Sequence, residues 1–397
     1  MQYTEGNTMR SGFVAFLIFI ILIPAIVSGQ TKVGTAGTSF LEGSLSLRAN
    51  GMGEAGVALF DPHSMYFNPA GLGLYATQQR ISITPPLWST TLPVDFRKQL
   101  ALAIVGFDAR QFGLGLPLSC GLGWYRVKFE SPEMVETDYY RAPTGRLFQW
   151  IEKSDNFVFA LAYNGSVRIA LGGTYKLIEQ GAEGRFNDKA HAFDYGATLQ
   201  LPLDSLFNMR LNETISAIVR PVFGVAWRNE GLDVDSGDNS YPLHSSRRWG
   251  YAIELGVKWK IPFWDWRLIS ITSAIDDEKT HLDDWLAHRG VEMGLVEAVS
   301  FRIGECDGRD DDSTTWVYNP GGDFDRTTWG FTISSPGLVK VLAALTSGTS
   351  TPPSRTLQFL MDRIAVEYTE ARYNYKSLFP DRKYRGLTIS YRHTLGH

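Results

Sequence analysis

Residues 48–74 read RANGMGEAGVALFDPHSMYFNPAGLGL, and this stretch indicates more about the fold than any other part of the chain. It is rich in glycine, which permits tight turns and close backbone approach. Asn68 precedes a proline and must be extended, while Pro69 is preset for the first turn of a short helix that Asn68 would cap. A compact segment of this kind, placed ahead of many amphipathic strands, predicts a plug. Its motif residues are Gly51, Gly53, Asn68, Pro69, Ala70 and Gly71.

The rest of the chain alternates between apolar residues and small or polar ones. In 251–261, Tyr251, Ile253 and Leu255 alternate with Ala252 and Glu254, and 167–177, 193–201 and 386–395 repeat the pattern. A period of two over about ten residues is expected of tilted transmembrane strands. The second face is mostly Gly, Ala, Ser and Thr with scattered charges, which suits a lumen filled by a plug and water. A soluble β-sandwich, the alternative, would pack one face into a core and solvate the other.

The alternating segments predict an all-β, antiparallel transmembrane β-barrel of about 14 strands with an N-terminal hatch inside the lumen. A tight turn at Glu297-Ala298 would keep that glutamate out of lipid. The predicted domains are a signal peptide at 1–29, a hatch at 30–78 and the barrel at 79–397. The predicted strands lie near 80–87, 98–107, 112–129, 155–164, 166–177, 190–201, 216–229, 248–261, 266–275, 290–296, 298–304, 327–334, 361–371 and 385–395.

The first 29 residues predict export. Arg10 precedes an apolar run at 13–27, and small residues follow before Gln30, as in a secretory signal peptide. A membrane anchor is the alternative, but the run is shorter than the roughly 20 residues that a spanning helix needs. Short connections alternate with long ones such as 130–154 and 305–326, which places both chain ends in the periplasm and the long loops outside. The expected location is the bacterial cell outer membrane, with its lipid as a partner.

The order of elements resembles the FadL-like outer-membrane proteins, whose N-terminal hatch carries an Asn-Pro-Ala motif. The wording GMGEAGVA…NPAGL is most similar to the PorV/PorQ branch of that superfamily. The resemblance implies a fourteen-stranded barrel, in agreement with the strand count. It is specific over 40–74 and architectural elsewhere, and it carries over no functional residue of the PorV branch.

The segment 112–129 is a candidate lateral gap. One of its faces holds Gly113, Gly115, Pro117, Gly121 and Gly123. Proline cannot donate to a strand ladder, and glycines let another backbone approach closely. In FadL-like transporters a kink in the third strand opens the wall for hydrophobic ligands. An ordinary bulge where the plug packs is the alternative. We expect Asn68, Pro69 and Ala70 to lie inside the barrel against the inner face of this segment, where its glycines leave room.

Other chemistry has weak support in the sequence. The net charge is −4, without the basic excess of nucleic-acid-binding proteins. Residues 51–56 spell G-x-G-x-x-G, but a buried strand before it and a helix after it are missing, so we expect no dinucleotide cofactor. Motifs of hydrolases are absent, and we expect no enzyme. Asp310, Asp311 and Asp312 in one acidic loop are a weak calcium candidate without the EF-hand order of ligands.

Two functions remain open. The first is transport of a small hydrophobic compound across the outer membrane. The second is an accessory role like that of the PorV branch, in which the barrel binds or shuttles secreted protein cargo in a type IX-like secretion system. The hatch motif and Pro117 favour the first, and the long loops favour the second.

Overall fold

A computed structural model describes residues 39–41, 44, 46–86, 97–138, 140–182, 188–236, 239–261, 264–280, 285–309, 326–347, 352–375 and 382–393. These residues all belong to one compact unit, 35–397. The predicted signal peptide at 1–29 and the acidic loop with Asp310, Asp311 and Asp312 lie outside the described residues.

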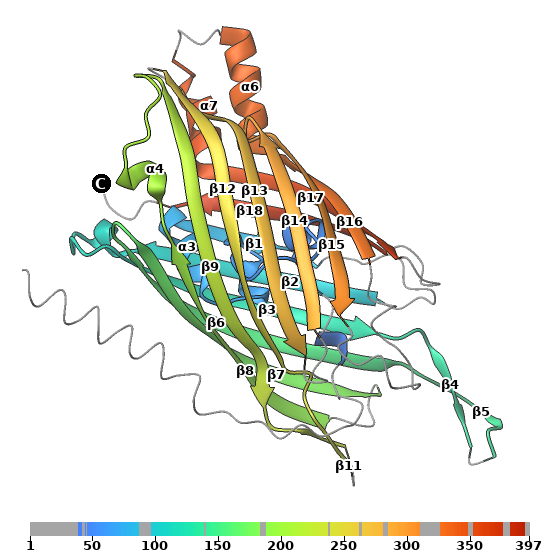
Figure 1. Cartoon of the computed structure of the whole chain (residues 1–397). Helices are drawn as coiled ribbons and strands as arrows, with labels where there is room; N and C mark the ends of the chain where they lie inside the picture. Colours follow the sequence, from blue (N-terminus) through green and yellow to red (C-terminus); the bar gives the residue numbers. More distant parts are fainter. Residues whose placement is uncertain are drawn as a thin grey trace, which may run out of the picture. The chain divides into compact units, whose positions relative to one another are not determined.

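Fourteen strands close into a single antiparallel barrel (Figure 1). Each strand pairs with its neighbours along the chain, and β1 pairs with β18 to close the wall. The predicted strand count is confirmed, and every predicted strand corresponds to one observed strand. The barrel strands are β1 (Arg80–Thr84), β2 (Arg97–Asp108), β3 (Leu118–Glu130), β6 (Trp150–Asn164), β7 (Arg168–Ala182), β8 (Asp188–Gln200), β9 (Ile215–Gly231), β12 (Ser246–Ile261), β13 (Trp264–Thr280), β14 (Trp285–Leu295), β15 (Val299–Arg309), β16 (Arg326–Ser334), β17 (Ile364–Tyr375) and β18 (Arg382–Arg392).

Shorter elements precede the barrel and connect its strands. Among the described helices, none combines the length and the apolar character needed to cross a bilayer. The helices and 3₁₀ turns are η2 (Ser39–Leu41), α2 (Leu47–Asn50), η3 (Ser64–Tyr66), α3 (Gly71–Tyr75), η4 (Ala76–Gln78), η5 (Ala109–Phe112), α4 (Leu203–Leu206), α6 (Ser335–Ser347) and α7 (Arg355–Arg363). Two small hairpins pair β4 (Met134–Thr137) with β5 (Pro143–Phe148) and β10 (Val234–Ser236) with β11 (Asn239–Tyr241).

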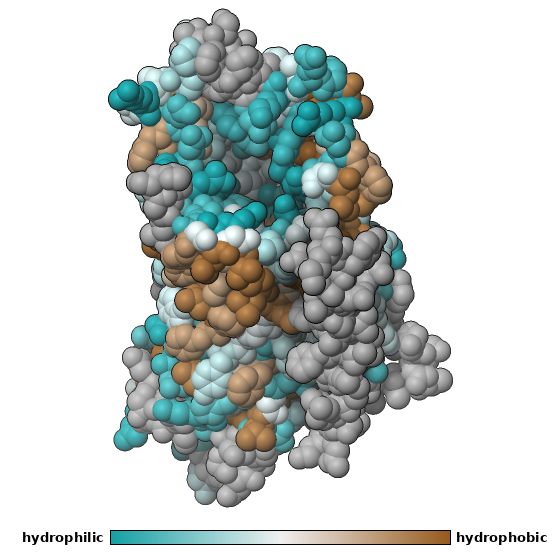
Figure 2. Space-filling model, turned by 90° about the vertical axis from the view of Figure 1, so that its left-hand side faces the viewer, coloured by the Kyte–Doolittle hydropathy of each residue, from teal (hydrophilic) through white to brown (hydrophobic). Residues whose placement is uncertain are grey.

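Burial along the strands follows the predicted alternation. In β7, Tyr175 is exposed on the outer wall, whereas Thr174 and Lys176 are buried in the lumen. In β12, Tyr251 and Leu255 face outward and Ala252 faces inward. Apolar surface gathers in brown patches between polar regions on the face shown in Figure 2. A closed wall leaves no backbone edge unpaired in lipid, so a barrel with an apolar exterior is the architecture of a bacterial outer-membrane protein. The closed sheet rules out the β-sandwich.

The connections are short at one end of the barrel and long at the other. The predicted turn at Glu297-Ala298 is present: Val296 and Glu297 have φ of 45° and 57°, and the turn joins β14 to β15. The β4–β5 hairpin projects from the other end of the barrel, the end that lies away from α6 and α7 (Figure 1). At the short-turn end, residues 335–347 form α6 and residues 355–363 form α7.

The third strand begins later than the sequence predicts. Pro117 has no N–H for the ladder, and Gly113 and Gly115 take left-handed φ values of 71° and 63° that a pleated strand does not accommodate. β3 therefore starts at Leu118, after the 3₁₀ turn η5, and residues 113–117 form an irregular connection. The Pro117 carbonyl still accepts a hydrogen bond from the Asn164 amide at 2.6 Å. Gly113, Gly115 and Pro117 therefore lie just before β3 and not within it, and the lateral gap at these residues stays a prediction.

Candidate functional site: the lumen and its hatch

The hatch, residues 46–79, contacts the inner wall on opposite sides of the barrel. Glycines on the wall make room for it, since a Cβ at any of them would lie too close to a hatch atom. At Gly172, on β7, a Cβ would lie 2.4 Å from the carbonyl carbon of Pro69. Further wall glycines in such contact are Gly106, Gly121, Gly123, Gly196, Gly224, Gly290 and Gly304. They lie on β2, β3, β8, β9, β14 and β15, so the hatch meets glycine on much of the barrel's circumference.

Asn68 ties two parts of the hatch to β8. Its side-chain amide donates to the carbonyls of Val57 at 2.9 Å and Ala197 at 3.1 Å, and to Thr198 Oγ1 at 3.0 Å. Its Oδ1 accepts from the Ala70 amide at 3.0 Å, as a helix cap would, although α3 begins one residue later, at Gly71. A fully buried amide with this many partners fixes the local backbone.

The Asn-Pro-Ala motif meets different strands from the predicted one. We expected Asn68, Pro69 and Ala70 to lie against the glycines of the third strand. Instead Asn68 lies at Gly196 of β8, and Pro69 and Ala70 lie at Gly172 of β7. The β3 glycines, Gly121 and Gly123, contact Leu72 and Met65 of the hatch, while Gly113 and Gly115 have no heavy atom within 4 Å of an added Cβ. In the sequence, the signal for these contacts was glycine at inward-facing positions of strands with period-two alternation.

The glycine-rich turn of the hatch is held through its backbone. Gly53, at φ 66°, donates to Thr328 Oγ1 at 2.8 Å. A Cβ there would lie 2.1 Å from the Glu305 carbonyl oxygen, so only glycine fits. Gly56 and Val57 donate their amides to one oxygen of Asp276, at 2.6 and 2.8 Å. Residues 51–56 therefore form a turn seated on β13 and β16.

Ion pairs hold the hatch on the side formed by β12 to β16. Arg48 of the hatch donates to both carboxylate oxygens of Glu292, through Nη2 at 2.7 Å and Nε at 3.1 Å, and Arg302 donates to the same carboxylate at 2.5 Å. Paired, hydrogen-bonded charges are the form in which ionised groups survive burial. A bidentate arginine fork also fixes geometry. Arg48, Glu292 and Arg302 thus form an ion-pair network that fixes the hatch to this side of the lumen, the charged side.

Glu54 makes the second ionic link of the hatch. Arg326 contacts its Oε2 at 2.8 Å, and the Tyr373 hydroxyl donates to Oε1 at 2.9 Å. Arg248 donates to the Glu54 carbonyl at 2.7 Å. Burial by itself raises the pKa of this hatch carboxyl, but the Arg326 and Arg248 guanidinium groups hold it below its ordinary value of 4.5. Glu54 is therefore a carboxylate at neutral pH.

The opposite side of the lumen is apolar and aromatic. Leu100, Leu102 and Ile104 line it from β2, and all three are almost fully buried. Aromatic rings from the hatch and the wall meet edge to face: Tyr66 with Tyr125 at 6.2 Å between centroids, a spacing typical of such pairs. The rest of this apolar side includes Phe40, Leu41, Met65, Phe67, Val127, Val158, Tyr373 and Tyr384. The lumen thus has a charged side at β12 to β16 and an apolar cluster, called the apolar side, whose wall residues come from β2, β3, β6, β7, β8, β17 and β18. A further buried ion pair, Lys176 with Asp194, joins β7 to β8.

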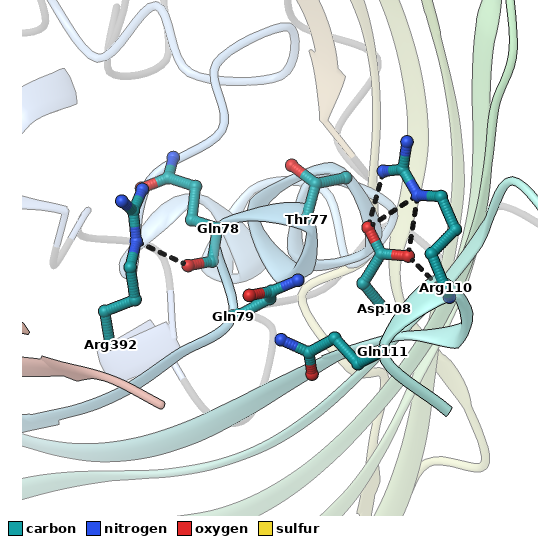
Figure 3. A pocket seen from close by; sticks show the side chains of 7 residues that line it. All are labelled: Thr77, Gln78, Gln79, Asp108, Arg110, Gln111 and Arg392. Atoms are coloured by element: carbon teal, nitrogen blue, oxygen red, sulfur yellow. Dashed lines mark hydrogen bonds and ion pairs between the residues drawn. The ribbon is translucent and has the colours of Figure 1, made fainter. Parts of the chain in front are cut away.

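A polar cavity of about 460 Å³ opens beneath the end of the hatch. Figure 3 shows its lining from three parts of the chain: the hatch end, the end of β2 with η5, and the end of β18. Arg392 donates to the Gln78 carbonyl at 3.3 Å, and Arg110 pairs with Asp108. The remaining lining residues are Thr77, Gln79 and Gln111. Within the described part of the chain, no group of His, Cys, Asp or Glu is arranged to hold a metal ion.

Comparisons with known proteins return structures only. No family model matches the sequence, and neither does any curated protein. The toluene transporter TodX of Pseudomonas putida aligns at 10% identity and a TM-score of 0.39, covering 88% of this chain and 97% of that one. A Pseudomonas aeruginosa FadL homologue aligns at 10% identity and a TM-score of 0.38, covering 93% and 100%. CdiB from Acinetobacter baumannii aligns at 6% identity and a TM-score of 0.35, covering 79% and 59%.

Proposed function

We propose that this barrel carries a small hydrophobic compound across the outer membrane. The observation that carries the proposal is the division of the lumen into a charged side that holds the hatch and an apolar side with wall residues from β2, β3, β6, β7, β8, β17 and β18. A hydrophobic solute gains free energy wherever it leaves water for apolar surface. The apolar side is thus the favourable route past a hatch that the charged side holds in place.

The exit we propose lies at β1, the shortest strand of the barrel. β1 spans Arg80–Thr84 and pairs with β18 only from Arg80 to Ile83, whereas β2 pairs with β3 along its whole length. Fewer ladder hydrogen bonds make this seam the easiest place to part the wall. Leu102 and Ile104 lie beside it on the lumen side, as register partners of Thr84 and Ser82. The exit therefore differs from the glycines of 112–129 on which the sequence-based gap rested.

A reversible disulfide tests this route. Ser82 of β1 and Ser390 of β18 are register partners whose hydroxyl oxygens are 2.7 Å apart in the lumen. Ser82→Cys with Ser390→Cys, in a chain with Cys120 and Cys306 replaced by alanine, should lock the seam when oxidised. The matched control is Thr332→Cys with Thr369→Cys, another buried register pair with hydroxyls 2.7 Å apart, between β16 and β17. Toluene uptake into proteoliposomes is the measurement.

Oxidation should slow toluene uptake through the β1–β18 variant, and reduction should restore it. The β16–β17 control should transport equally in both redox states. Unchanged uptake after complete crosslinking of the β1–β18 pair, verified by mass spectrometry, would refute the seam as the exit. Absence of toluene uptake above protein-free liposomes, together with none for longer alkanes, would refute the transport proposal itself.

The second candidate function is an accessory barrel of the PorV kind that binds secreted cargo. The β4–β5 hairpin favours it, because the hairpin projects from the long-loop end (Figure 1) and exposes Tyr140, Val135 and Leu147. Exposed apolar side chains on a projecting element are a frequent feature of binding surfaces. Replacement of 134–148 by a short Gly-Ser linker should abolish cargo binding if this role holds and leave toluene uptake unchanged if transport holds.

A further inference from the structure

Helix α6 lies against the outside of the barrel wall at its short-turn end. Trp259 of β12 is on the same face as Leu255, which points outward, and its register partner on β13 is Trp266. Trp266 is nevertheless only 6% exposed, because it packs in a cluster with Ala343 of α6. A pair of outward tryptophans near a strand end is the usual mark of the membrane interface. The helix therefore covers the wall at interface height.

The start of α6 is fixed to the neighbouring turn. Lys340 donates to the Asp265 carbonyl at 3.0 Å and pairs with Glu297 at 2.5 Å. A Cβ at Gly337 would lie 2.2 Å from the Glu297 carbonyl carbon, so glycine is required for this approach. Leu357 and Met361 of α7 pack into the same cluster as α6. The orientation of α6 about its own axis is thus set by contacts.

The face of α6 turned away from the wall carries a leucine stripe. Leu338, Leu342 and Leu345 are 39%, 61% and 78% exposed, and their spacing of four and three residues places them on one side of the helix. The stripe begins five residues after Ile333, an outward residue of β16 that is itself exposed. The apolar outer band of the barrel thus continues onto the helix. Figure 1 shows α6 projecting beyond the ends of the strands.

We propose that the stripe inserts among the acyl chains of the periplasmic leaflet and that α6 is an interfacial anchor. Continuity with the lipid-facing band identifies the occupant: the wall beneath the helix ends in tryptophans, and the strand that leads into it is apolar on its outer face. One apolar face of α6 packs on the wall through Val341, Ala343 and Ala344. At this depth the second apolar face, the leucine stripe, lies in the acyl boundary. Lys340 stays at the polar edge through its pair with Glu297.

Depth-dependent quenching tests the proposal in the intact barrel. Single cysteines replace Leu342 and Leu345 in the cysteine-free chain, carry the fluorophore NBD, and are reconstituted in liposomes with nitroxide-labelled phosphatidylcholine. Ile271→Cys, on the outer face of β13, is the lipid-exposed reference. Gln358→Cys, on the exposed polar face of α7, is the aqueous reference. Heat-modifiable gel migration verifies that each labelled barrel is folded.

We expect NBD at 342 and 345 to be quenched at least threefold more than at 358, with the strongest effect from nitroxides near the headgroup end of the acyl chain. Quenching at 342 equal to that at 358, while 271 is quenched, would overturn the proposal.

Discussion

A Cβ at Gly172 of the barrel wall would lie 2.4 Å from the carbonyl carbon of Pro69 in the hatch. The neighbouring Gly173 faces outward, and the nearest atom to a Cβ there is 3.7 Å away. The two adjacent glycines therefore have different structural roles, because only Gly172 makes room for the hatch.

Gly172→Val should displace the hatch and destabilise the barrel by about 1–3 kcal/mol, as overpacking of a close contact does. Gly173→Val should be nearly neutral, since it adds apolar surface toward lipid. Conductance in planar bilayers and urea unfolding in liposomes measure both effects. Equal behaviour of the two variants would mean that the hatch does not rest on Gly172.

Glu292→Gln should release the hatch from the charged side. The change leaves the buried Arg302 and the partly buried Arg48 without their shared carboxylate, and breaking a buried pair costs roughly 3–5 kcal/mol. The control is Glu305→Gln, whose pair with Arg289 is about half exposed on both sides and should matter by less than about 1 kcal/mol. Protease cleavage within 48–74 in reconstituted barrels is the readout. Equal resistance of the hatch to protease in the two variants would mean that Glu292 does not hold the hatch.

Acidification should loosen the hatch through Glu54. Its pKa is lowered in the folded barrel, so its pairing with Arg326 stabilises the hatch above the ordinary pKa of 4.5. That contribution is lost as the pH falls through the lowered value. Conductance should therefore rise as the pH is lowered below 4.5. In Glu54→Gln, conductance should already be raised at pH 7 and change less with pH. If Glu54→Gln and the unmodified barrel show the same dependence of conductance on pH, other carboxylates cause the rise in conductance.

Leu255→Arg tests the outer face. Leu255 is 41% exposed on the wall, and an arginine in mid-membrane lipid costs about 2–4 kcal/mol. The matched control is Leu232→Arg in the connection after β9, where the leucine is 82% exposed and the same change should cost less than about 0.5 kcal/mol. Denaturant titration in liposomes gives both values. A Leu255→Arg variant as stable as the control would mean that this face does not meet lipid.

Impermeant thiol labelling of intact cells tests the orientation. Tyr140→Cys, in the β4–β5 hairpin, should react, since Tyr140 is 84% exposed at the long-loop end. Glu297→Cys, in the short turn beside α6, should react only after the outer membrane is permeabilised. The opposite pattern would invert the barrel and move α6 to the cell surface.

The strands and their facing were predictable from the sequence because period-two alternation is a local property. Leu255 and Gly256 show which way a strand faces without any knowledge of its neighbours. The plug was predictable in kind, since Asn68, Pro69 and the glycines of 51–56 encode turns and a helix start. The start of β3 was not, because the left-handed conformations of Gly113 and Gly115 leave no trace in an alternating pattern.

The sequence by itself determined a closed barrel of about fourteen strands, its apolar exterior and a turn-rich segment ahead of it, because hydrophobic periodicity and glycine and proline chemistry act over a few residues. Only the tertiary structure decided which wall each hatch residue meets. Arg48 and Glu292 are 244 residues apart, and Asn68 and Thr198 are 130 apart. Contacts over such separations depend on how the barrel closes and on the path of the hatch through it. No short-range pattern encodes either, which is why the motif lies on β7 and β8 and α6 covers Trp266.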